Sequence, residues 1–158
     1  MNLCEFRPEC CIISLIYINR LIAFTEIPLQ PTNWRPLTLC SLLVAQKVWD
    51  DRYLSNADFA FIYPFFVTSE INKLEKKFLE LIQYNVTVRS NLYAKYYFEL
   101  SALHKDDLSE YPMMPLDKRQ CEQLEIHSKI FGEMRDKEIV DKRLNNSFGG
   151  VSSKPMFE

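Results

Sequence analysis

Cysteine and histidine are the side chains of this chain with the greatest capacity for nucleophilic or metal chemistry. The five cysteines and two histidines are Cys4, Cys10, Cys11, Cys40, Cys121, His104 and His127. They form neither C-x-x-C nor H-E-x-x-H spacing, so we expect no metal site. The adjacent Cys10 and Cys11 would suit a small helical enzyme, but no general base stands near them in the sequence. The odd number of cysteines favours reduced thiols in an intracellular protein.

The composition excludes two further classes of site. Glycine occurs only three times, at Gly132, Gly149 and Gly150, so neither common phosphate-binding loop, G-x-G-x-x-G or G-x-x-x-x-G-K-[ST], is present. The 19 Lys and Arg residues stand against 21 Asp and Glu, for a net charge of −2. A dedicated nucleic-acid-binding protein usually carries a clear basic excess. We therefore expect no cofactor and no nucleic-acid partner.

Two charged residues on separate expected helices would suit contact with a protein partner. Val44, Lys47 and Val48 share one helix face at spacing i, i+3, i+4, and Glu75 and Leu79 share a face of a later helix. By residue type alone, Lys47 also suits the C-terminal end of a helix, and Glu75 suits a solvated surface. The apolar neighbours also suit the protein core.

Apolar residues recur at helical spacing along most of the chain, which predicts an all-α bundle of five or six helices in one domain. The expected helices lie at about 9–24, 37–49, 55–64, 68–82, 90–104 and 117–143. The second is apolar on nearly every side, so we expect it at the centre of the bundle. The charged run 133–143 is expected to be a solvated helix face.

Polar residues that favour helix N-caps precede three of these helices. Asn33 is the expected cap of the second, Ser55 or Asn56 of the third, and Thr68 of the fourth. Glu70 then stands in the first turn of the fourth helix, where its charge suits the positive end of the helix dipole.

The longest apolar stretch, Cys10 to Phe24, does not predict a membrane anchor. Asn19 and Arg20 interrupt it, and it is shorter than the ~20 residues that cross a bilayer. Its start lacks the charged region and cleavage site of a secretory signal, and the chain begins Met-Asn rather than the Met-Gly of N-myristoylation. We expect an intracellular protein, cytoplasmic or nuclear.

Three sequence stretches are more specific than the helical spacing. They read KVWDD at 47–51, LEKKFLELIQYN at 74–85 and YAKYYF at 93–98. Together they resemble the cyclin family, and in detail its cyclin Y branch, which is related to the Pho80-like cyclins. Residues 36–51 resemble the third helix of a cyclin box and residues from 68 onward its fifth. The resemblance covers about 9–135 and begins at the second helix of the box.

The resemblance implies a single cyclin box, a helical bundle of the five-helix type, shortened at its N-terminus because the first helix is missing. The box would span 9–104, a C-terminal helical extension 105–144, and a disordered tail 145–158. Membrane recruitment would then require a partner or a missing N-terminal segment.

The resemblance also implies a non-catalytic subunit that binds and activates a cyclin-dependent serine/threonine protein kinase. The kinase would be of the PFTAIRE/PCTAIRE group, or the Pho85-like kinase of the fungal branch. Lys47 and Glu75 match the pair that hydrogen-bonds kinase backbone, where the αC helix of the kinase docks. The apolar lining of that site is matched by Val44, Val48, Leu79, Tyr84 and Val86.

One other function stays open on the same residues. A cyclin-like helical adaptor, or a degenerate paralogue, would bind a protein partner without activating a kinase. The sequence does not decide between a cell-cycle and a signalling role.

Overall fold

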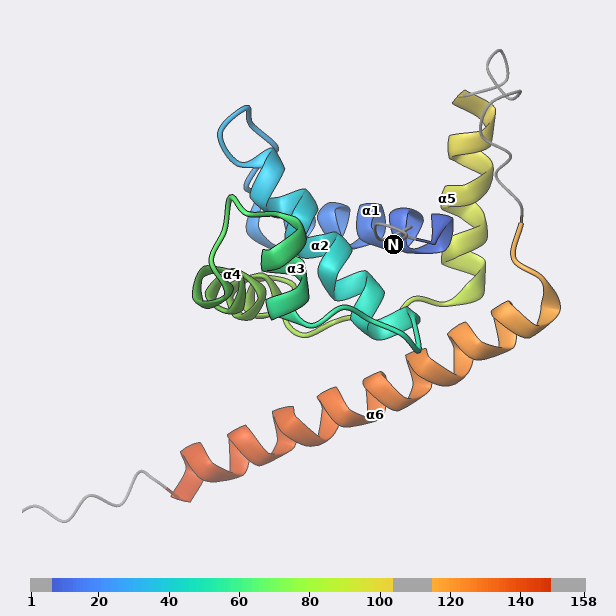
Figure 1. The fold of residues 1–158 in the computed structure, drawn as a ribbon. Helices are drawn as coiled ribbons and strands as arrows, with labels where there is room; N and C mark the ends of the chain where they lie inside the picture. Colours follow the sequence, from blue (N-terminus) through green and yellow to red (C-terminus); the bar gives the residue numbers. More distant parts are fainter. Residues whose placement is uncertain (1–6, 104–114, 149–158) are drawn as a thin grey trace, which may run out of the picture.

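The computed structural model describes residues 7–103 and 115–148, with side chains up to residue 143. These residues form helices and connecting segments, with no strand among them, which confirms the all-α fold class (Figure 1). The helices are α1 (Pro8–Thr25), α2 (Trp34–Trp49), α3 (Asn56–Ile62), α4 (Thr68–Leu81), α5 (Ser90–Leu103) and α6 (Lys118–Phe148).

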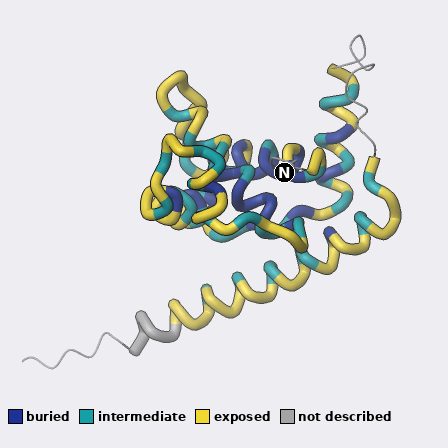
Figure 2. Tube along the Cα trace, viewed as in Figure 1, coloured by how far each residue is buried: buried dark blue, intermediate teal, exposed yellow. Residues whose placement is uncertain are grey.

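Helix α2 lies at the centre of the bundle, as its apolar sequence predicts. It packs against α1 and α4, and its Val44 belongs to a large core cluster shared with α1, α4, α5 and the segment after α4. Its Leu43 joins a smaller cluster with Phe59 of α3 and Ile71 of α4. Figure 2 shows the buried residues concentrated where α1 and α2 meet the rest of the bundle. One helix thus holds both halves of the core together.

Helix α1 is long and apolar enough to cross a membrane, judged by length and composition alone. Its inner face nevertheless packs against α2, α4 and α5, and eight of its residues are buried. The hydroxyl groups of Ser14 and Ser41 satisfy each other across the α1–α2 contact at 2.6 Å. Burial in the protein core therefore accounts for the apolar character of α1.

The expected N-cap positions are confirmed for Asn33 and Ser55, and the expected cap Thr68 is wrong. Ser55 caps α3 through a hydrogen bond from the Asp58 backbone N–H. The N-cap of α4 is Val67, not Thr68, and Glu70 satisfies its N–H through a carboxylate oxygen at 3.1 Å. Asn33 holds the N-cap position of α2, but its side chain accepts a hydrogen bond from the Gln30 backbone N–H instead. Glu70 thus satisfies the N–H of the N-cap residue, which is a different group from the N–H that a Thr68 hydroxyl cap would accept.

Helix α6 diverges from the bundle and makes few contacts with it (Figure 1). It continues to Phe148, so residues 145–148, expected in the tail, are helical. Residues 105–114 and 149–158, expected to be extension and tail, lie outside the described residues. The division into a cyclin box and a C-terminal extension stays a prediction.

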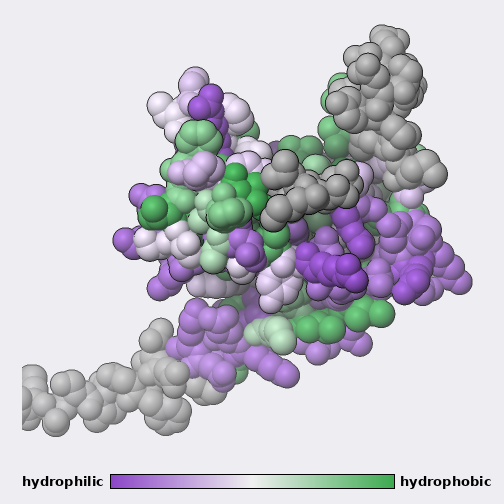
Figure 3. Space-filling model, viewed as in Figure 1, coloured by the Kyte–Doolittle hydropathy of each residue, from purple (hydrophilic) through white to green (hydrophobic). Residues whose placement is uncertain are grey.

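Apolar side chains also gather on the surface around α3 (Figure 3). Phe61 is 82% exposed and Phe65 is 86% exposed, and Tyr53 and Val67 are exposed beside them in the sequence. On the opposite side of the same helix, Phe59 is buried in the smaller core cluster. Helix α3 thus presents aromatic residues both to the core and to solvent.

Candidate partner-binding groove

All seven residues predicted to bind a partner line one cavity of about 300 Å³. They come from α2, α4 and the segment after α4, and we call the surface they form the α2–α4 groove: Val44, Lys47, Val48, Glu75, Leu79, Tyr84 and Val86. The remaining wall comes from α6, which the sequence did not predict. The geometry therefore brings the predicted residues together, while their role in binding a kinase stays a prediction.

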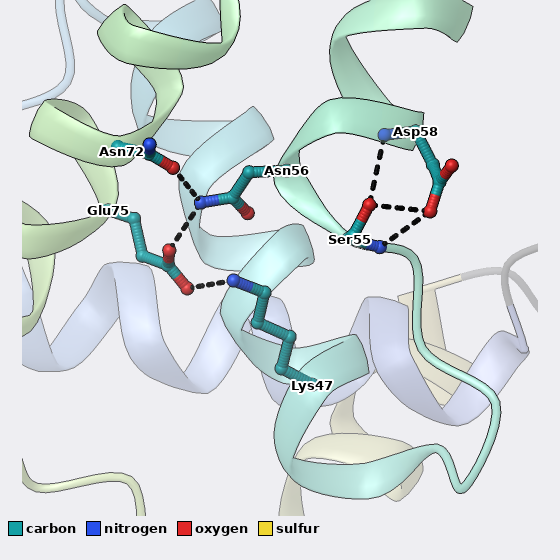
Figure 4. A network of polar contacts seen from close by, with 6 residues as sticks. All are labelled: Lys47, Ser55, Asn56, Asp58, Asn72 and Glu75. Atoms are coloured by element: carbon teal, nitrogen blue, oxygen red, sulfur yellow. Dashed lines mark hydrogen bonds and ion pairs between the residues drawn. The ribbon is translucent and has the colours of Figure 1, made fainter.

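An ion pair closes the polar end of the groove (Figure 4). The Lys47 Nζ atom lies 2.6 Å from Glu75 Oε1. The two side chains are 26% and 16% exposed, so water screens this pair less than it screens a surface pair. The two charges lie on neighbouring helices, and their attraction fixes α2 and α4 at this edge of the groove.

Asn56, the first residue of α3, holds the other oxygen of Glu75. Its Nδ2 donates to Glu75 Oε2 at 2.7 Å and to Asn72 Oδ1 at 2.6 Å (Figure 4). Both carboxylate oxygens of Glu75 therefore have a donor, which fixes the orientation of the carboxylate. Sequence reasoning considered Asn56 only as a helix cap, because nothing in its local pattern indicates a contact with residues 16 and 19 positions away.

A capping box sets the position of Asn56. The Ser55 backbone N–H and hydroxyl both donate to Asp58 Oδ2, at 3.1 Å and 2.6 Å. These two bonds hold the pKa of the Asp58 carboxyl below its usual value, and the bond from the Ser55 hydroxyl has the larger effect. The first turn of α3 is thus fixed one residue before the side chain that orients Glu75.

The end of α4 directs the chain into the apolar part of the groove. The Tyr84 N–H bonds the Leu79 carbonyl at 2.7 Å, and the Gln83 N–H bonds the Glu80 carbonyl at 2.9 Å. Together these are the two hydrogen bonds of a Schellman motif. Gln83 and Tyr84 both have positive φ, 54° and 53°, a strained conformation for residues other than glycine. The turn brings Tyr84 and Val86 alongside Leu79.

Two side chains of α1 hold the segment after α4 from its buried side. The Tyr17 hydroxyl donates to the Val86 carbonyl at 2.8 Å. Arg20 donates to the Asn85 carbonyl and, at 3.1 Å, to the Thr87 carbonyl. Burial raises the pKa of the Tyr17 phenol, which therefore stays a neutral donor. Sequence reasoning missed this pair, although an arginine within an apolar helix is itself a signal for a buried acceptor.

Helix α6 supplies the outer wall of the groove, which corrects part of the expectation for the run 133–143. Four of its residues line the cavity: Phe131, Met134, Arg135 and Glu138. Further along the helix, Lys142 Nζ lies 5.3 Å from the centre of the Tyr84 ring. The spacing of these residues places them on one face of α6, so that face is not simply solvated.

The surroundings of the adjacent cysteines disfavour nucleophilic chemistry. Burial, the largest cause, raises the pKa of the Cys10 thiol to about 12 and also raises the pKa of the Cys11 thiol. A cysteine nucleophile reacts as the thiolate and needs a lowered pKa. Across the residues that the structure describes, no group of three or more His, Cys, Asp or Glu side chains could hold a metal.

Comparison with known families decides the class of protein. The family model described as Cyclin matches residues 1–86, more than half of the 158 residues. The chain belongs to the cyclin family. Cyclins are regulatory, non-catalytic subunits, so the protein is a cyclin-type regulator of kinases. No solved structure matches the chain.

The matched region contains every residue of the α2–α4 groove that was predicted from the sequence. Those residues extend from Val44 to Val86, and the family match ends at residue 86. Helices α5 and α6 lie beyond it. The groove of this cyclin therefore combines walls from the matched region with one wall from outside it.

Proposed function

We propose that this cyclin binds and activates a cyclin-dependent kinase by receiving the αC helix of the kinase in the α2–α4 groove. The observation that carries the proposal is the ion pair of Lys47 with Glu75 beside an apolar floor. Apolar anchors with a few polar groups that fix register are what a groove for a partner helix requires. Holding the αC helix inward would let its glutamate pair with the lysine that orients the ATP phosphates.

The ion pair keeps capacity for partner hydrogen bonds. The Lys47 ammonium has three N–H donors, and its contact with Glu75 uses one of them. The Glu75 carboxylate accepts bonds from Lys47 and Asn56 and has further lone pairs. A kinase backbone N–H and C=O could therefore join the pair without separating the two charges.

We further propose that the kinase belongs to the PFTAIRE/PCTAIRE group or, in a fungal setting, is Pho85-like. The support is the resemblance of KVWDD, LEKKFLELIQYN and YAKYYF to the cyclin Y branch. The proposal places this cyclin inside the cell, cytoplasmic or nuclear, together with its kinase.

A second candidate function is binding of a protein partner without kinase activation. The exposed Phe61 and Phe65 favour it, because they form an apolar surface outside the α2–α4 groove. Such a surface would let a cyclin act as an adaptor even if its groove remained closed.

One experiment separates the two functions. The full chain is mixed with a purified PFTAIRE/PCTAIRE-type kinase domain, and co-elution and phosphorylation of a peptide substrate are measured with and without the chain. Co-elution with at least a tenfold rise in phosphorylation supports activation. Co-elution without a rise supports the adaptor, and absence of co-elution contradicts the proposed partner.

A further inference from the structure

The groove proposed to receive a kinase helix is partly covered by the protein's own α6. Phe131, Met134, Arg135 and Glu138 line the same cavity as Lys47 and Glu75. Phe131 is partly buried against the main core cluster, whereas Met134 is 60% exposed. The covering segment therefore rests on the groove without being sealed into the core.

A docking helix and the covering part of α6 would compete for the same surface. A helix with side chains is about 10 Å across, so one that contacted Lys47 and Leu79 would also reach the α6 residues that line the same cavity. A partner helix of several turns could enter the α2–α4 groove only if the covering part of α6 moved away.

The first half of α6 is attached much more firmly than the covering part. Leu124 is 3% exposed, and the Ser128 hydroxyl bonds both the N–H and the C=O of Val88, at 2.9 Å and 2.5 Å. Glu125 Oε1 accepts from the Ser90 N–H and hydroxyl at 2.7 Å and 2.6 Å. These donors hold the pKa of the Glu125 carboxyl below its usual value, so it stays an ionised acceptor.

The second half of α6 is held near its end by exposed contacts, which are weaker than the buried ones of the first half. Lys142 lies over the Tyr84 ring and forms an ion pair with Glu138 at 2.9 Å, and both charged side chains are at least half exposed. Exposed contacts of this type contribute little to stability. Helix α6 is thus anchored around Leu124 and Ser128, and beyond Phe131, which packs partly against the core, the contacts of Glu138 and Lys142 are exposed ones.

We propose that residues 131–142 of α6, which we call the α6 strap, form an autoinhibitory contact that closes the α2–α4 groove and is displaced when a kinase helix docks. This inference rests on the proposed function and adds regulation to the same site. A protein that binds only in its open state has an apparent affinity reduced by the fraction that is open. Weakening the strap should therefore tighten kinase binding.

The first test weakens the strap in the full chain. Phe131→Ser with Met134→Ser removes its apolar contacts, and Ile130→Ser with Val140→Ser is the matched control on exposed positions of the same helix. We expect the first variant to bind a PFTAIRE/PCTAIRE-type kinase domain roughly 5- to 30-fold more tightly, the factor that one to two kcal/mol represents. The control should bind within about twofold of the unsubstituted chain. Equal or weaker binding by the strap variant would overturn the proposal.

The second test detects contact between the α6 strap and the groove, and it does not require a kinase to bind. Met134 is replaced by p-benzoylphenylalanine, the chain is irradiated, and the cross-linked residues are identified by mass spectrometry. We expect cross-links to α2 or α4 in the isolated chain and their loss when saturating kinase domain is added. Absence of these cross-links in the isolated chain, or their persistence in a kinase complex, would contradict the strap. If no variant binds the kinase while the cross-links form, the proposed function fails and the closed groove stands.

Discussion

At the scale of single residues, the shape of the groove depends on side chains that lie behind its wall. Tyr17 and Arg20 of α1 bond three successive carbonyls, those of Asn85, Val86 and Thr87. These contacts hold the irregular segment that brings Tyr84 and Val86 to the groove. A backbone segment without helix or sheet partners needs such donors when it lies against the core.

Removing the Tyr17 hydroxyl should destabilise the protein. Tyr17→Phe keeps the ring but leaves the Val86 carbonyl without its donor. We expect a loss of about 1 kcal/mol in the free energy of unfolding, measured by urea denaturation. Tyr96→Phe is the control, because that hydroxyl accepts an exposed bond from Asn19, and its loss should be within about 0.5 kcal/mol. Equal losses for the two variants would show that Tyr17 does not support the segment.

At the scale of elements, short helix α3 matters because its first residue orients Glu75. Ser55→Ala removes the side-chain oxygen that accepts from the Asp58 N–H. We expect a loss of about 1 kcal/mol in the free energy of unfolding. Ser69→Ala, at an exposed position in the first turn of α4, should stay within about 0.5 kcal/mol. Indistinguishable unfolding curves for the two variants would argue against the cap.

The same capping box predicts a pH dependence. The folded pKa of Asp58 is depressed by its bonds to Ser55, so its contribution is complete above the unfolded pKa of about 3.9 and is lost as pH falls through the folded pKa. The difference in unfolding free energy between the unsubstituted chain and Asp58→Asn should therefore be constant near neutral pH and shrink below about pH 4. A Ser55→Ala background should weaken this trend, and a difference that grows on acidification would contradict the assignment.

The sequence predicts the helices better than their ends. Ser55 was a correct cap because its bond with Asp58 is local, closed within one turn. Thr68 was wrong because Val67 holds the N-cap position, so the helix begins one residue earlier, and Glu70 accepts a hydrogen bond from the Val67 N–H. Thr68 and Glu70 both favour a helix start nearby, and the sequence alone does not say which residue holds the N-cap position.

At the scale of the whole molecule, the groove could be predicted and its cover could not. Val44, Lys47 and Val48 share a face through local spacing, and the cyclin resemblance supplied the pairing of α2 with α4. Met134 lines the groove because of the position of α6 on the bundle. That position depends on the hydrogen bond between Ser128 and Val88, which are 40 residues apart in the sequence. A mostly charged segment gives no local sign of such a contact.

The central claim is that Lys47 and Glu75 are the polar groups that fix the position of a kinase helix in the α2–α4 groove. The affinity of a PFTAIRE/PCTAIRE-type kinase domain is measured by calorimetry for Lys47→Ala, Glu75→Ala and the double variant. Lys95→Ala with Glu99→Ala, an exposed pair of the same residue types on α5, is the control. Removing one member of a desolvated pair should cost about 2–5 kcal/mol, a factor of about 30 to several thousand in affinity. The control should change by less than about fivefold, and an unchanged affinity for the Lys47/Glu75 double variant would contradict the account.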